Sequence, residues 1–177
     1  ANSGVVEVLP GTFGPDLEQE LRARHGLTVG HFPQSFELAT VGGWVASRGA
    51  GQYSTRYGKI EDMVVGLEVV LADGTVVRTG GAPAAAAGPD LTQLFVGSEG
   101  TLGVITRVWL RAHPVPPAER RAAWSLPSFH AGVELCRRVL RAGATPAVLR
   151  LYDEAESQRG HGGDGTESVL IVLDEGD

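Results

Sequence analysis

Three glycines stand three residues apart, at positions 97, 100 and 103 of the segment GSEGTLGVIT, just before an apolar stretch. Glycine at this spacing is unfavourable in a helix and costly in a strand, because it loses much backbone entropy and packs no side chain. Chains accept that cost where the backbone approaches another group closely, and exposed N–H groups in such a segment can hold a polar cofactor. The alternative is a tight helix-to-strand connection without a ligand. The spacing alone leaves both interpretations open.

Charge and composition limit the kinds of partner, metal and membrane association that we expect. The chain has 177 residues, a formal net charge of −6 and no Lys/Arg-rich run, so we expect no nucleic-acid partner. Its single cysteine excludes an internal disulfide, and its histidines lack metal-ligand spacing, so we expect no metal. No apolar run is long enough to cross a membrane and the N-terminal residues lack a signal-peptide layout, so we expect a cytoplasmic protein without a transmembrane segment.

Residues 1–115 predict a mixture of strands and helices. Strands are expected at 5–9 and 103–112, and a hairpin at 65–79 turns at Asp73-Gly74. In this reading Val104, Thr106, Val108 and Leu110 share one side of the later strand. A helix is expected over 15–26, ended by Gly26, and a shorter one over 88–97, capped by Asp90. Residues 30–58 are glycine-rich and are predicted to form a loop.

The pattern changes after the prolines at 114, 116 and 117, which predict a linker and a domain boundary near 115/116. A strand at 120–127, a helix at 128–143 and strands at 146–153 and 168–177 follow. This order is typical of the opening part of a split β-α-β layer. The sequence therefore predicts an α+β chain in two parts, with Cys136 as a buried small hydrophobe on the helix.

Two further segments carry candidate chemistry. The run TVGGWVASRGAGQYSTRYG, residues 40–58, is too long and too rich in aromatic residues and valine for disorder, which favours a backbone wrapped around a flat polar ligand over an irregular surface loop. Arg150 lies between two leucines on a predicted strand. It is either a solvent-facing residue of an alternating strand or a charged fork held toward an anion. GHGGDG, residues 160–165, matches a dinucleotide pattern but lacks the strand before it and the helix after it, so we interpret it as a loop.

The chain resembles the FAD-linked oxidases of the vanillyl-alcohol-oxidase type in the order and spacing of four segments: TVGGWVASRGAG, YGKIEDMVVGLEVVLADGTVVRTG, GPDLTQLFVGSEGTLGVIT and LRLYD. GSEGTLG fits the whole family, whereas GGW followed by SRGAG, and LRLYD after the linker, point to its alkylglycerone-phosphate synthase branch. The D-lactate and glycolate dehydrogenases of the family usually carry asparagine at the place of Trp44. The resemblance implies a partial PCMH-type FAD-binding domain over residues 1–115 and the start of an α+β, ferredoxin-like cap domain over 116–177.

The resemblance also implies FAD as the cofactor and names its contacts. Arg150 falls at the position of an arginine important for activity in the synthases. The cofactor contacts it implies are Gln34, Ser35, Phe36, Glu37, Leu38, Ala39, Thr40, Gly42, Gly43, Ser47, Arg48, Gly49, Ala50, Glu99, Gly100, Thr101, Leu102, Gly103, Val104 and Ile105. Gln34 departs from the pattern, because the synthases have an acid there.

Three functions stay open at this point. A synthase exchanges an acyl group for a fatty alcohol on glycerone phosphate without net redox change. A 2-hydroxyacid dehydrogenase passes hydride to the flavin, and a segment without bound flavin would catalyse nothing. We expect a small-molecule or lipid-derived substrate, and the resemblance allows a homodimer. The first phosphate-binding loop of the family would precede Ala1, and its Tyr and His cluster would follow Asp177, so we expect the segment alone to be inactive.

Overall fold

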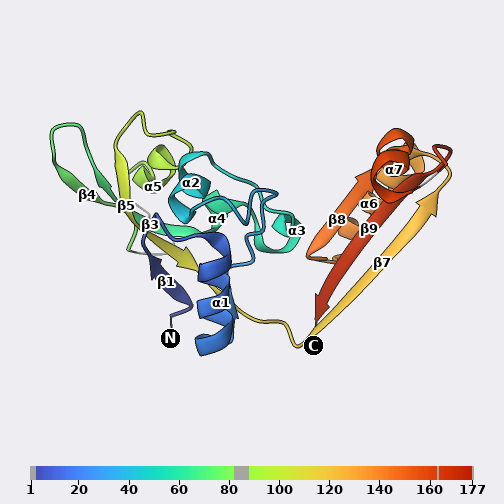
Figure 1. The fold of residues 1–177 in the computed structure, drawn as a ribbon, viewed down its shortest axis with the longest axis horizontal. Coiled ribbons are helices and arrows are strands. Elements are labelled where there is room, and N and C mark those ends of the chain that lie inside the picture. The colour runs from blue at the N-terminus through green and yellow to red at the C-terminus, as the bar shows by residue number, and fades with distance from the viewer. Residues whose placement is uncertain (1–2, 82–87, 163, 177) are drawn as a thin grey trace. The chain divides into compact units, whose positions relative to one another are not determined.

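The computed structural model describes residues 3–81, 88–162 and 164–176, in two compact units (Figure 1). The first unit is Ala1–Val115 and the second is Pro116–Asp177. The division falls within the proline-rich segment, where fixed proline φ angles and missing N–H donors interrupt regular structure.

An antiparallel sheet in the order β1-β5-β3-β4 forms the frame of the first unit. Its strands are β1 (Val5–Val8), β3 (Val64–Val70), β4 (Val76–Arg78) and β5 (Val104–Arg111). Val70 pairs with Val76, so the predicted hairpin is confirmed, and Gly74 takes a φ of 84° in its turn. A smaller pair, β2 (Leu27–Thr28) and β6 (His113–Pro114), adds a second antiparallel contact.

The predicted common face of the β5 side chains is wrong in its first half. Glu68 pairs with Arg107 and Val69 pairs with Ile105, so Thr106 is an extra residue opposite β3. Such a bulge shifts the alternation of side chains by one position. Val108 is therefore buried, Ile105 packs against the core, and Val104 is 66% exposed.

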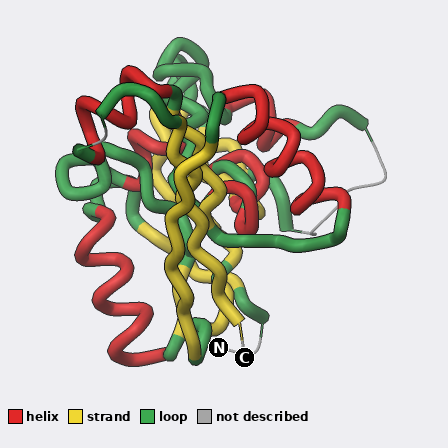
Figure 2. Tube along the Cα trace, turned by 90° about the vertical axis from the view of Figure 1, so that its right-hand side faces the viewer, coloured by secondary structure: helices red, strands yellow, loops and turns green. Residues whose placement is uncertain are grey.

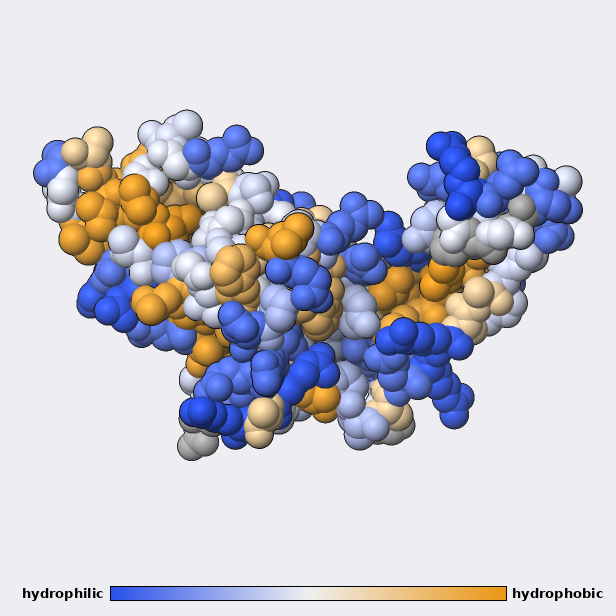
Figure 3. Space-filling model, in the orientation of Figure 1, coloured by the Kyte–Doolittle hydropathy of each residue, from blue (hydrophilic) through white to orange (hydrophobic). Residues whose placement is uncertain are grey.

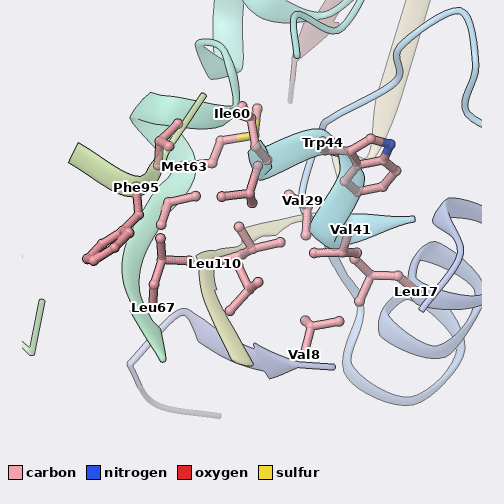
Figure 4. Packing of buried hydrophobic residues seen from close by; sticks show 14 of the residues in the cluster. Val8, Leu17, Val29, Val41, Trp44, Ile60, Met63, Leu67, Phe95 and Leu110 are labelled. Atoms are coloured by element: carbon pink, nitrogen blue, oxygen red, sulfur yellow. The ribbon is translucent and has the colours of Figure 1, made fainter. Parts of the chain in front are cut away.

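Helices of the first unit pack apolar residues against the sheet (Figure 4). α1 (Gly14–His25) buries Leu17 and Leu21, and Gly26 ends it in the left-handed region, as predicted. The side chains of the core that Figure 4 labels are Val8, Leu17, Val29, Val41, Trp44, Ile60, Met63, Leu67, Phe95 and Leu110. Leu67, Val108 and Leu110 are fully buried, which anchors β3 and β5 beneath the helices.

The prediction of a loop over residues 30–58 is wrong in two places, because short helices α2 (Val41–Ala46) and α3 (Ser54–Tyr57) form there. α4 (Ile60–Met63) follows directly. Thr40 caps α2 by accepting a hydrogen bond from the Gly43 N–H, and Val41, Trp44 and Val45 of this helix are buried. Burial of these three side chains offsets the poor helix propensity of the Gly42-Gly43 pair. The predicted cap of α5 (Leu91–Phe95) is confirmed, since Asp90 Oδ1 accepts from Thr92 N.

The second unit has a three-stranded antiparallel sheet in the order β7-β9-β8. Its elements are β7 (Ala118–Leu126), α6 (Phe129–Arg141), β8 (Val148–Tyr152), α7 (Glu154–His161) and β9 (Ser168–Gly176). β9 lies between the other two strands, which is the expected split arrangement, and runs beside β7 over its length (Figure 2). α7 was not predicted, although Asp153 caps it at Glu156 N. Cys136 is only half-buried, so its interpretation as a buried residue is wrong.

Candidate functional site

A groove of about 400 Å³ on the first unit brings together three segments that are far apart in sequence. They are the turn after β1, the beginning of α2 and the segment GSEGTLG with the start of β5. The lining residues are Pro10, Gly11, Thr40, Gly42, Gly43, Ala46, Gly100, Gly103, Val104 and Ile105. None of them carries a charged side chain. The groove therefore presents an uncharged surface of backbone, glycine and aliphatic atoms.

Close backbone approach holds α2 against the turn after β1. Gly42 N–H donates to the Pro10 carbonyl oxygen at 2.8 Å, and Val41 N–H donates to that of Thr12 at 2.9 Å. A Cβ atom added to Gly42 would lie 2.6 Å from the Pro10 Cβ. Real Cβ atoms do not come so close, so the absence of a side chain at Gly42 is what allows this wall of the groove.

The three evenly spaced glycines have different functions in the fold. Gly97 and Gly103 have positive φ angles of 81° and 155°, and both are crowded. An added Cβ would lie 3.0 Å from the Arg48 side chain at Gly97, and 2.7 Å from the Val70 carbonyl oxygen at Gly103. Gly100 also has a positive φ, of 80°, but an added Cβ would meet nothing within 4 Å. Gly97 and Gly103 thus serve the connection to the strand. Gly100 and Gly103 both line the groove, but of the three glycines only Gly100 has open space where a Cβ would lie.

The bulge in β5 turns Val104 toward the groove. Val104 lines the groove and is 66% exposed, and the neighbouring Leu102 is 43% exposed. Figure 3 shows apolar residues at the surface over the end of this unit that holds β4 and the start of β5. Bulges often redirect a side chain in this way beside binding sites. The exposed aliphatic surface offers a face on which a planar ring can lie.

The predicted cofactor contacts fall into two groups. Seven of them line the groove: Thr40, Gly42, Gly43, Gly100, Gly103, Val104 and Ile105. Gln34–Ala39 form a turn outside the lining, in which Leu38 is 84% exposed and Phe36 packs against Gly14. Glu99 and Thr101 flank the lining residue Gly100, whereas Gly49 and Ala50 lie on the loop after α2 and do not line the groove. The Ser47 hydroxyl donates to the Gly43 carbonyl oxygen at 2.8 Å.

The side chain of Arg48 stabilises the end of α5. Its Nη2 donates to the carbonyl oxygens of Gln93 and Val96, at 3.2 and 3.0 Å. Cations at a helix C-terminus satisfy carbonyls that have no partner within the helix. The backbone of Arg48 has a φ of 53°, unusual for a residue with a side chain. These contacts give Arg48 a structural function beside the groove.

Arg150 lies on β8 of the second unit, opposite Ile171 of β9. The neighbouring Leu151 contacts α6 where Gly132 leaves room, so Arg150 points to the other side of the sheet. Its guanidinium carbon lies 5.3 Å from the centroid of the Tyr152 ring, and the side chain is half-exposed. A permanently charged, partly accessible fork on a strand can bind an anionic group.

The sequence analysis did not select Pro10, Gly11 or Ala46 as site residues. The Pro10-Gly11 pair was a visible signal, because it breaks the first strand. Ala46 lines the groove only because α2 is helical, which places it one turn after Gly42 and Gly43. Because residues 30–58 were predicted to form a loop, the sequence analysis could not identify Ala46 as a lining residue.

A family model described as "FAD binding domain" matches residues 1–80. Residues 1–80 therefore match an FAD-binding domain, and the chain is related to the FAD-linked oxidoreductases, which confirms the resemblance stated from the motifs. It is 44% identical over 163 residues to the FAD-linked oxidoreductase YgcU of Escherichia coli (strain K12). It is 41% identical over 143 residues to the alkyldihydroxyacetonephosphate synthase of Caenorhabditis elegans.

These alignments cover 90% and 81% of this chain, but only 33% and 24% of the two relatives. A solved structure of alkyldihydroxyacetonephosphate synthase superimposes with a TM-score of 0.85 at 30% identity, over 99% of this chain and 35% of that one. The chain thus spans about a third or less of the proteins it matches. Within the described residues, no helix combines the length and apolar character needed to cross a membrane.

Proposed function

We propose that the whole protein is an FAD-dependent enzyme, to which this chain contributes part of a PCMH-type FAD-binding domain and the beginning of a ferredoxin-like cap domain. The observation that carries the proposal is the groove itself. Segments around Pro10, Gly42 and Gly100, selected partly from sequence motifs, line a single surface. The match of residues 1–80 to an FAD-binding family supports the same cofactor.

The chemistry of the groove fits the adenosine side of FAD better than its pyrophosphate. Backbone, glycine and aliphatic atoms suit a flat ring with a polar edge, whereas two phosphates need cations or several converging N–H donors. None of the groove residues is charged. When bound, FAD supplies a redox-active isoalloxazine ring, and the chain's own residues bind and orient the cofactor.

For the reaction, we propose exchange of an acyl group for a fatty alcohol on glycerone phosphate. The similarity to the alkyldihydroxyacetonephosphate synthases supports this choice. In this proposal, Arg150 contacts the anionic group of the substrate, because guanidinium binds phosphate through two parallel hydrogen bonds. A small-molecule or lipid-derived substrate in a cytoplasmic protein belongs to the same proposal.

The second candidate is oxidation of a 2-hydroxy acid. It is supported by the 36% identity over 148 residues to the glycolate oxidase subunit GlcD of Bacillus subtilis (strain 168). The same Arg150 guanidinium would then bind the substrate carboxylate.

The test uses the whole protein. Purified protein should show the visible absorption spectrum of oxidised flavin, and heat should release FAD. A synthase incorporates a labelled fatty alcohol in place of the acyl group without net bleaching, whereas a 2-hydroxy acid dehydrogenase is bleached anaerobically by its substrate. Protein that is colourless and takes up no added FAD would overturn both candidates.

A further inference from the structure

Four polar side-chain atoms of the first unit are buried without a hydrogen-bond partner within the described residues. They are Nδ1 and Nε2 of His31, Nε1 of Trp44 and Oε2 of Glu61. His31 is 1% exposed and Trp44 is 3% exposed, so bulk solvent does not reach these atoms. Buried polar groups without partners are rare in folded proteins because they lose hydration and gain nothing in return. Their presence calls for a physical explanation.

A neighbouring residue shows how this fold satisfies a buried polar group for structural purposes. Glu18 is 6% exposed, and its carboxylate accepts hydrogen bonds from Val29 N at 2.8 Å and Thr28 Oγ1 at 2.7 Å. Arg22 Nε donates to the same carboxylate at 2.9 Å. His31 lies only two residues beyond Val29, but within the described residues its ring nitrogens make no such hydrogen bonds. A phenylalanine would fill the same space without unsatisfied nitrogens, so packing alone does not account for histidine.

Both nitrogens of His31 face a glycine loop. A Cβ atom added to Gly51 would lie 3.2 Å from Nδ1, and one added to Gly49 would lie 3.7 Å from Nε2. The loop is held near His31 by a hydrogen bond from Gln52 N–H to the Phe32 carbonyl oxygen, at 2.8 Å. It continues directly from Ser47 and Arg48, which belong to a predicted cofactor contact. The nitrogens thus lie against the backbone that supports this contact.

The ring of His31 also connects to the other predicted segment. It packs edge-on against Trp44, with centroids 4.8 Å apart, and Trp44 stacks on Phe36 at 6.2 Å. Phe36 lies within the Gln34–Thr40 turn. Figure 4 shows the Trp44 indole at the margin of the core, with its nitrogen directed away from the aliphatic side chains. His31 and Trp44 therefore lie between the two segments, 34–40 and 47–50.

Burial keeps the His31 imidazole neutral. It lowers the pKa of His31 to about 4, although the Glu61 carboxylate acts in the opposite direction. A neutral imidazole has one N–H donor and one bare nitrogen that accepts. It can therefore bond a carbonyl oxygen and an amide N–H of the same loop at once.

We propose that His31 is a positioning residue of the cofactor site, whose two nitrogens hydrogen-bond the Gly49–Gly51 backbone when FAD is bound and so hold Ser47–Ala50 against the cofactor. The inference rests on the proposed function. Glycines at 49 and 51 let this loop adjust without side-chain clashes. Binding of FAD to one side of the loop then recovers hydrogen bonds on the other, which couples His31 to cofactor affinity without direct contact.

The test compares His31→Phe and His31→Gln with the unmodified whole protein. His31→Phe keeps a ring against Trp44 but removes both nitrogens, so FAD should bind about tenfold more weakly, the loss expected for one or two hydrogen bonds. Its melting temperature without FAD should stay equal or rise, because the unsatisfied nitrogens are gone. His31→Gln restores a donor and an acceptor and should recover part of the affinity. His25→Phe, an exposed histidine of the same unit, is the matched control and should bind FAD normally.

Nitrogen-15 NMR of His31 measures hydrogen bonding of the imidazole nitrogens directly, and a function in packing alone would leave these chemical shifts unchanged when FAD is added. Addition of FAD should shift both imidazole nitrogens toward hydrogen-bonded values, and this measurement decides the matter if His31→Phe fails to fold. Equal FAD affinity of His31→Phe and unmodified protein, or imidazole shifts unchanged by FAD, would overturn the inference while leaving the FAD proposal intact. Failure of the unmodified protein to bind FAD would instead overturn the proposed function.

Discussion

The backbone N–H of Gly97 donates a hydrogen bond to the carbonyl oxygen of Val45 at 2.9 Å. Two residues later, Glu99 N–H donates to the Ala46 carbonyl oxygen at 3.0 Å. These bonds join the end of α2 to the GSEGTLG segment and engage carbonyls that have no partner within the short helix. Two walls of the groove are therefore one hydrogen-bonded structure, and changes in either should affect both.

Substitution by valine should affect mainly flavin occupancy at Gly100 and mainly stability at Gly103. Gly100→Val costs on the order of 1–2 kcal/mol because of the positive φ, and it should lower flavin occupancy more than stability, since the new side chain projects into open space. Gly103→Val adds a clash with β3 and should cost about 3 kcal/mol or more. The ratio of flavin to protein absorbance and thermal melting of both variants measure this. Normal flavin content in Gly100→Val with a collapsed melting temperature would contradict a cofactor function for Gly100.

Arg48→Ala should lower the free energy of unfolding by about 1 kcal/mol, because it removes two charge-assisted hydrogen bonds to the end of α5. Arg48→Gly should cost less, because glycine tolerates the φ of 53° at this position. Arg24→Ala is the control: its ion pair with Glu20 is exposed, so denaturant titration should show almost no change. If Arg48→Ala and Arg24→Ala have the same free energy of unfolding, Arg48 does not stabilise the end of α5.

Arg150→Lys in the whole protein should lower turnover roughly ten- to a hundredfold while FAD stays bound. Lysine keeps the charge but loses the planar fork that binds phosphate or carboxylate at two points. Steady-state turnover and flavin content are measured on the same sample. Arg137→Lys, at an exposed helix position paired with Glu134, is the control and should be silent. Unchanged turnover of Arg150→Lys would make Arg150 a solvent-facing strand residue.

His31 should make stability depend on pH. Its pKa is about 4 in the folded chain and 6.5 without burial, so the unfolded state binds the proton more readily between these values. The stabilisation is fully present above pH 6.5 and is lost as the pH falls toward 4. Between pH 7 and pH 5 the unfolding free energy should drop by about 2 kcal/mol more in the unmodified protein than in His31→Phe. Parallel pH profiles of the two would show that His31 is not kept neutral by the fold.

Local signals predicted the elements whose ends are set by their own residues. Gly26 ends α1, Asp90 caps α5 and Gly74 makes the β3–β4 turn, all as expected, because a positive φ or a capping oxygen acts within a few residues. The short helix α2 escaped prediction because Gly42 and Gly43 are poor helix formers and its stability comes from the burial of Val41, Trp44 and Val45. Thr40 was the one local signal for it.

The sequence by itself determined the motifs, the α+β character and the relation to FAD-linked proteins, since these depend on residue types in a fixed order. The tertiary structure alone decided which glycines leave space for a ligand. Gly97, Gly100 and Gly103 look alike in sequence, yet Arg48 crowds the first, β3 crowds the third, and the second is open. It also decided that Val104 turns outward at the β5 bulge and that the buried His31 nitrogens find no hydrogen-bond partner in the part of the chain that the structure describes. Each depends on atoms brought together from distant parts of the chain, which no local pattern of residues can specify.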